Sequence, residues 1–208
     1  MVKRYMSIEF NFSDPLWVTS QIFAFFALIF SVWSWQIKNK VKMMFMVGIF
    51  SALLAVSASL LQNYTLGVLF GLAAVRNFVF SYLDWRVSKG KKVAKWLPYF
   101  FAVIFAVSTI TSTVVLVYVL QVPTFGAWLE WLICATLLGL IVGNVLAGTN
   151  LMRCSFIANR VFNIINHIYF NNAIAVIIAL AAIGSNIVFY IRELVAWIKQ
   201  RKKSKGEV

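Results

Sequence analysis

The sequence has few of the residues from which catalytic and metal sites are usually built. Its 208 residues include two cysteines, one histidine and six acidic side chains. This set is too small for a metal site of the usual cysteine and histidine composition. Cys134 and Cys154 both fall in expected membrane spans, so we interpret them as packing residues rather than as a disulfide.

Motifs of enzymes are missing as well. The chain contains no nucleophile elbow, glycine-rich phosphate loop, His-Glu zinc motif or pair of intramembrane aspartates. We therefore expect no enzyme activity, no cofactor and no metal.

Apolar residues, in contrast, are abundant. They make up 62% of the chain, and the mean hydropathy is +0.86, more than a soluble domain of this size can bury. Apolar runs of about 20 residues recur, which is the length of a membrane-spanning helix. Helices are predicted because an open sheet would leave backbone groups unpaired in lipid. The expected spans are roughly 16–37, 43–61, 65–84, 98–120, 126–147, 151–170 and 173–198.

The net charge of +13 comes from basic residues that are concentrated on one side of the membrane when the spans alternate in direction. Lys3 and Arg4 lie on one side, and the turns at 62–64, 121–125 and 171–172 on that side carry no Lys or Arg. The positive-inside rule then predicts the N-terminus outside and the C-terminus in the cytoplasm. We expect the basic side to attract anionic lipid headgroups, and we expect no nucleic-acid partner. The residues on the basic side are Lys38, Lys40, Lys42, Arg86, Lys89, Lys91, Lys92, Lys95, Arg153, Arg192, Lys199, Arg201, Lys202, Lys203 and Lys205.

Two parts of the chain resemble each other at a spacing of 186 − 77 = 109 residues. Asn77 matches Asn186 at this spacing, and both are followed by a Val-Phe pair two residues later. The spacing predicts two copies of a three-helix unit, and the helix at 98–120 between them gives both copies the same orientation. The expected divisions are 1–85 for the first repeat, 86–121 for the basic loop and linker helix, 122–199 for the second repeat, and 200–208 for a disordered basic cytoplasmic tail.

Short motifs carry a resemblance to known membrane proteins. They are the basic approach to the second helix, Asn63-Tyr64, Arg76, Met152-Arg153-Cys154, Asn166-His167 and Asn186. On these residues the chain is identified as a member of the YgjV family of bacterial inner-membrane proteins. Its three-one-three helix order also resembles the SWEET sugar transporters and the PnuC vitamin-precursor transporters of the same clan. The resemblance implies an all-α integral membrane fold in the bacterial inner membrane, with two parallel three-helix bundles joined by a linker helix.

Asparagines inside the spans are candidates for contact with a solute. Asn77 and Asn186 lie near the middle of their helices, at positions whose counterparts contact substrate in SWEET-like proteins. An amide there either binds a polar solute or serves as a hydrogen bond between helices. Asn159, Asn163 and Asn166 lie on one face of the sixth helix and predict either a cavity wall or a hydrogen-bonded seam.

Charged and titratable residues in the spans form a second set of candidates. Arg76 and Arg160 lie near the midplane with no carboxylate at their depth, so they either bind an anionic solute or bond to amides and carbonyls. Gln21 and Glu130 occupy equivalent repeat positions near the outer side and are candidates for a gate or a coupling site. His167 is either a proton relay or a simple hydrogen-bonding residue.

These observations favour a small-solute transporter with a central site between the two repeats, working as a facilitator or a proton-coupled carrier. The alternative is a membrane receptor or assembly protein on the same scaffold that binds a ligand without moving it. The expected ligand in the first case is a small polar or anionic solute.

Overall fold

The computed structural model describes residues 11–37, 39–145 and 149–204, and within these ranges the protein is helical, without strands. The helices are α1 (Pro15–Gln36), α2 (Lys40–Leu60), α3 (Tyr64–Ser88), α4 (Leu97–Val114), α5 (Ala127–Val145), α6 (Thr149–Tyr169) and α7 (Ala173–Ser204), and a π-helical turn, Val115–Val119, continues α4. The prediction of seven helices is confirmed, and the observed ends lie close to the expected ones except at the C-terminal end of α7.

Polar caps fix where several helices begin. The Asp14 side chain accepts a hydrogen bond from the Leu16 N–H at 2.9 Å, and Pro15 occupies the first turn of α1. The Asn39 side chain accepts one from the Lys42 N–H at 3.1 Å at the start of α2. Such caps satisfy backbone N–H groups that have no partner inside the helix.

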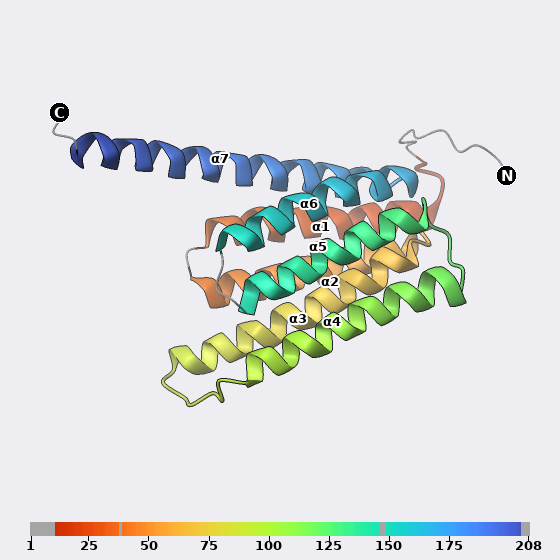
Figure 1. The fold of residues 1–208 in the computed structure, drawn as a ribbon. Coiled ribbons are helices and arrows are strands. Elements are labelled where there is room, and N and C mark those ends of the chain that lie inside the picture. The colour runs from red at the N-terminus through yellow and green to blue at the C-terminus, as the bar shows by residue number, and fades with distance from the viewer. Residues whose placement is uncertain (1–10, 38, 146–148, 205–208) are drawn as a thin grey trace.

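The helices run up and down along one common direction (Figure 1). The α1–α2 and α3–α4 connections lie at one end, which we call the basic end because it carries Lys42 and Lys89–Lys92. The α2–α3, α4–α5 and α6–α7 connections lie at the opposite end (Figure 1). Helix α7 runs along one side of the bundle and extends beyond it, whereas α3 and α4 lie on the other side (Figure 1).

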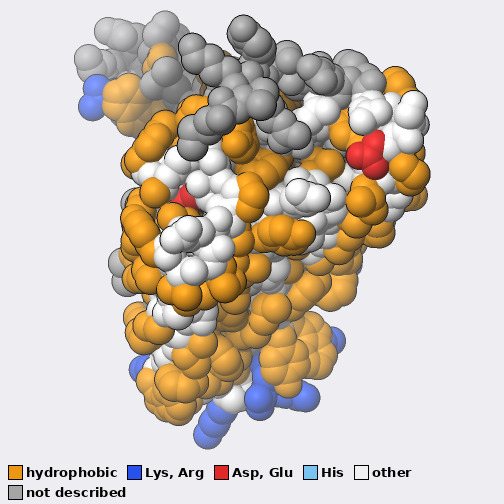
Figure 2. All heavy atoms as spheres, turned by 90° about the vertical axis from the view of Figure 1, so that its right-hand side faces the viewer, with side chains coloured by type: hydrophobic (Ala, Val, Ile, Leu, Met, Phe, Trp, Pro, Cys, Tyr) orange, Lys and Arg blue, Asp and Glu red, His pale blue; other side chains and the backbone are white. Residues whose placement is uncertain are grey.

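Five helices in the described residues are long and apolar enough to cross a membrane: Pro15–Ser34, Val41–Leu60, Tyr64–Ser88, Leu97–Val119 and Ala173–Arg192. The apolar part of α5, Ala127–Val142, is shorter. Helix α6 belongs to neither group, because it carries many polar side chains. Figure 2 shows the end opposite the basic end, where apolar side chains cover the flanks and blue Lys and Arg side chains appear only at the margins.

A hydrophobic cluster joins the two halves of the chain. It includes Ala24 and Ala27 of α1, Leu54 of α2, Ile133 of α5 and Ile178 of α7, all of them nearly or fully inaccessible. Small side chains such as the two alanines let helix backbones approach closely, which is how helices associate in lipid. The cluster therefore closes the centre of the bundle toward the end where α3 and α7 begin.

The turns before α3 and α7 have the same backbone geometry at the 109-residue spacing. Gln62 and Asn171 both have positive φ, 60° and 56°. The next residue donates to a carbonyl five positions back in each case, Asn63 to Ala58 at 3.0 Å and Asn172 to His167 at 2.8 Å. Matching residues thus build matching turns in the two halves.

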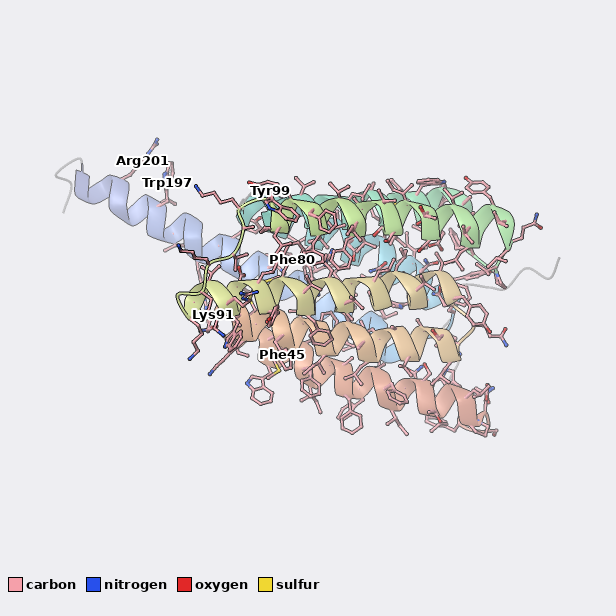
Figure 3. The ribbon with its side chains drawn as sticks, turned by 90° about the horizontal axis from the view of Figure 1, so that it is seen from below. Phe45, Phe80, Lys91, Tyr99, Trp197 and Arg201 are labelled. Atoms are coloured by element: carbon pink, nitrogen blue, oxygen red, sulfur yellow. The ribbon has the colours of Figure 1, made fainter. Side chains whose placement is uncertain are left out.

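One expectation about the tail is wrong. Helix α7 continues to Ser204, so the disordered segment expected from Gln200 onward is helical up to that residue. The Arg201 guanidinium lies 4.0 Å from the centre of the Trp197 ring, one turn earlier, and such i, i+4 contacts stabilise an exposed helix. Figure 3 shows this pair on the part of α7 that extends past the bundle. Lys3, Arg4, Lys38 and the expected tail residues 205–208 lie outside the described residues.

The two equivalent caps make a matched test of the contact between halves. The Asn63 side chain caps the Leu66 N–H, whereas Asn172 caps the Ala175 N–H and also donates to Ser57 Oγ in α2 at 2.8 Å. A lost cap costs about 1 kcal/mol, and the extra hydrogen bond contributes about 1 kcal/mol more. We expect Asn172→Ala to lower the free energy of unfolding about twice as much as Asn63→Ala, measured by denaturant unfolding in detergent micelles. Equal losses would show that the bond to Ser57 contributes nothing.

Candidate functional site

Three asparagines of α6 form a hydrogen-bonded seam with α5. Asn166 Nδ2 donates to Glu130 Oε1 at 2.9 Å. Asn159 Nδ2 donates to Thr136 Oγ1 at 3.0 Å, and Asn163 Nδ2 donates to Asn159 Oδ1 at 2.9 Å. All three asparagines are buried, as is Glu130. The polar stripe therefore faces protein, and the hydrogen-bonded seam that the sequence left as one alternative is present.

The adjacent face of α6 points toward α2 and α3. The Arg160 guanidinium carbon lies 5.0 Å from the centre of the Phe50 ring of α2 and 4.7 Å from that of Phe156. The His167 ring stacks on Phe70 of α3, with centres 6.1 Å apart and planes inclined by 11°. Arg160 and His167 are 3% and 1% exposed. Helix α6 belongs to the second half of the chain, and this face contacts α2 and α3 of the first half.

Many polar atoms of this region have no hydrogen-bond partner. Arg160 forms no ion pair in the described part of the chain, and its Nε and Nη1 are buried and unpaired. An unpaired buried polar group costs about 1–3 kcal/mol, and more when it is charged. Such groups are typical of places that hold water or a ligand. The other unpaired atoms of α6 and of its partner Glu130 are Glu130 Oε2, Asn163 Oδ1, Asn166 Oδ1 and His167 Nε2.

Arg76 and Asn77 form a separate polar pair. Arg76 Nη2 donates to Asn77 Oδ1 at 3.4 Å, a long hydrogen bond, and both side chains are buried. Arg76 borders a cavity of about 10 Å³ between α3, α4 and α5, together with Thr109 and Leu137. A cavity of this size holds at most one water molecule. Arg76 therefore faces the α4 side of the bundle.

The structure does not bring Asn77 and Asn186 together. Their helices, α3 and α7, lie on opposite sides of the bundle (Figure 1). Asn186 Nδ2 donates to the Ala182 carbonyl of its own helix at 2.8 Å. Contact of either asparagine with a solute stays a prediction.

Gln21 joins α1 to the start of α7. Its Oε1 accepts a hydrogen bond from the Ile174 N–H at 3.1 Å, and Trp17 Nε1 donates to the Asn171 carbonyl at 3.0 Å. Gln21 and Glu130, which match at the 109-residue spacing, are thus both buried hydrogen-bonding residues near the same end of the bundle.

Several residues of this region were not predicted from the sequence. Phe50 and Phe70 supply the rings against Arg160 and His167, and apolar residues inside a span give no signal for such a role. Thr136 and Ser57 are bonding partners of Asn159 and Asn172. Ser57 had a detectable signal, because it lies 109 residues before Asn166 and thus marks the equivalent position in the first half.

Apolar flanks, several membrane-length helices and a polar centre define an integral membrane protein of the all-α class. Comparison with protein families places it further: the family Imp-YgjV, described as a bacterial inner membrane protein, matches residues 18–195, and the chain belongs to this family. Searches of curated proteins and of solved structures find no match.

The contact between Glu130 and Asn166 is the basis for a double-mutant cycle. Asn166→Leu should lower the free energy of unfolding by about 1–3 kcal/mol, because it leaves the buried Glu130 carboxyl without its donor. Adding Glu130→Leu should restore at least half of this loss, since both partners are then apolar. Thermal unfolding in detergent measures both effects.

The neutral pair Asn159 and Thr136 is the matched control for this cycle. Asn159→Leu combined with Thr136→Val should show a smaller coupling energy, because no carboxyl is left unpaired. A coupling as large as that of Glu130 and Asn166 would contradict the special role of the carboxyl.

Proposed function

We propose that the protein is a carrier for a small polar solute with an anionic group, and that this solute binds at the polar face of α6 between the two halves of the chain. The observation that carries the proposal is that α6 and its partner Glu130 carry buried, unpaired hydrogen-bonding atoms, at Arg160, Asn163, Asn166, His167 and Glu130. A solute that supplies the missing partners would offset the cost of burying them.

The types of unpaired atoms indicate what such a solute offers. Arg160 presents two unpaired nitrogen donors, Nε and Nη1, which suit a carboxylate or a phosphate. Two amide oxygens, Asn163 Oδ1 and Asn166 Oδ1, are unpaired and can accept hydrogen bonds from hydroxyl or N–H groups. The unpaired Glu130 Oε2 accepts such a bond when the carboxyl is ionised. A solute with an anionic group and hydrogen-bond donors fits this set.

A structural role alone accounts less well for Arg160. A charge near the membrane centre costs roughly 3 kcal/mol or more on insertion scales. The cation–π contacts with the Phe50 and Phe156 rings, about 1–2 kcal/mol each, offset much of this cost. They give no hydrogen-bond partner to Arg160 Nε and Nη1, which stay unpaired. The described residues provide no carboxylate at ion-pair distance from Arg160.

The duplicated turns support a mechanism for movement. In this proposal α1–α3 and α5–α7 are two parallel units joined by α4, and they rock against each other to expose the site alternately. All seven helices cross the membrane, with the start of α1 outside and the basic end in the cytoplasm. Glu130 and His167 are the candidates for proton coupling, and Gln21 belongs to the outer gate.

A receptor on the same scaffold is the second candidate. The hydrophobic cluster that joins α1, α2, α5 and α7 favours it, because a tightly packed centre resists rocking. A receptor would bind the same anionic solute at Arg160 without carrying it across.

Arginine substitutions test the site. We expect Arg160→Gln to lower solute counterflow into proteoliposomes at least tenfold, because hydrogen bonds to a charged donor contribute about 1.5–3 kcal/mol and 1.4 kcal/mol is a factor of ten. The assay uses a panel of radiolabelled carboxylates, phosphate esters and neutral sugars. Arg76→Gln is the matched control, since it removes a similarly buried arginine on the α4 side, and it should keep most of the flux.

Other outcomes have distinct meanings. Solute-dependent thermal stabilisation without flux would favour the receptor. Loss of flux in Arg76→Gln or Asn77→Ala, with normal flux in Arg160→Gln, would move the site to α3 and contradict the proposal.

A further inference from the structure

An open groove lies between α1, α2 and α3 near the basic end, away from the polar face of α6. Its volume is about 950 Å³, the size of a typical ligand site. Its walls are mainly apolar and aromatic, with Asn39, Lys42 and Ser81 as the polar exceptions. The apolar and aromatic residues of the lining are Trp33, Ile37, Val41, Phe45, Met46, Phe78, Tyr82 and Trp85.

Phe45 and Phe78 line the groove side by side, and the Phe78 ring packs against the backbone of α2. Their ring centres lie 5.4 Å apart. A Cβ atom added to Gly48 would lie 2.6 Å from the Phe78 ring, so only glycine at this position lets the ring rest against α2. Ser81 Oγ donates to the Val41 carbonyl at 2.9 Å and ties α3 to the first turn of α2. The groove is thus a built feature with fixed walls.

Positive charge lies at the end of the groove nearest the basic end. Lys42 is exposed and belongs to the lining. Lys91 Nζ lies 5.5 Å from the centre of the Trp85 ring, which also belongs to the lining. Figure 3 shows Phe45 and Lys91 toward this same end of the bundle. An apolar channel along the helices with cations at its head matches the shape of an anionic phospholipid.

The chemistry of the walls favours a lipid over the other possible occupants. Trp33, Phe45 and Tyr82 are about half exposed, with 53%, 48% and 55% of their surfaces accessible, so the groove opens onto the apolar flank of the bundle. A water-soluble solute would gain little there. A second copy of the chain would bring a second Lys42 against the first, and like charges repel.

We propose that this groove binds one anionic phospholipid, with an acyl chain along Phe45 and Phe78 and the phosphate between Lys42 and Lys91. The site is independent of the proposed carrier activity. The proposal goes beyond a general attraction of the basic end to the membrane surface, because it predicts one bound lipid and a site that selects an anionic headgroup.

Quenching of tryptophan fluorescence tests the proposal, since Trp33 and Trp85 line the groove. The protein is reconstituted in phosphatidylcholine vesicles that contain a minor fraction of brominated phosphatidylglycerol or, separately, of brominated phosphatidylcholine. We expect more quenching by the brominated phosphatidylglycerol. Trp33→Phe combined with Trp85→Phe should remove the excess, which assigns it to the groove.

Charge variants complete the test. Lys42→Glu should abolish the excess quenching, whereas Lys95→Glu, an equal change at an exposed residue outside the lining, should keep it. Soluble glycerol phosphate, which has no acyl chain, should not compete. Equal quenching by the two brominated lipids, or equal loss in both charge variants, would overturn the proposal. Disulfide-linked dimers of Phe45→Cys in a Cys154→Ser background would overturn it in favour of a second copy.

Discussion

Helix α6 cannot expose its polar face to lipid, and this constraint organises the bundle around it. Each unsatisfied polar group in a hydrocarbon environment costs several kcal/mol. The protein meets the constraint in two ways. Helix α5 supplies Glu130 and Thr136 as partners for the asparagines, and α2 and α3 supply the Phe50 and Phe70 rings that cover Arg160 and His167. The polar face of α6 is therefore covered by side chains of the neighbouring helices.

The same constraint explains how the two halves are held together at the end where α7 begins. The first N–H groups of α7 have no partner in their own helix, and they lie in an apolar environment. Gln21 of α1 and Asn172 satisfy two of them, and Asn172 also donates to Ser57 of α2. The start of α7 is thus completed by side chains from the first half of the chain, which couples the two halves at this end.

The sequence allows the helices and turns to be predicted because these depend on local signals. Asn63 and Asn172 mark helix starts, and their repetition at 109 residues points to equivalent turns that the structure contains.

The partners of α6 depend instead on how helices rotate about their axes, which apolar segments do not encode clearly. Arg76 illustrates this: its place within a helix was predictable, but its direction toward α4 and α5 was not. The extension of α7 to Ser204 was missed because its basic composition resembles that of a disordered tail, and the contact of Arg201 with Trp197 is visible only once the helix exists.

The positions of the polar and apolar parts indicate which side of the bundle would have to open. The hydrophobic cluster that joins the two halves also includes Leu66 of α3, Leu129 of α5 and Ala175 of α7. These residues lie near the starts of their helices and close the end of the bundle where α7 begins. Arg160 lies about midway along α6, against Phe50 at the inner edge of this cluster. In the proposed carrier, a solute bound at Arg160 would therefore be separated from the end where α7 begins by these packed side chains. In the proposed carrier, opening this end would break the hydrogen bonds of Gln21 and Asn172 together with the cluster, so these bonds would contribute to the energy difference between its two states.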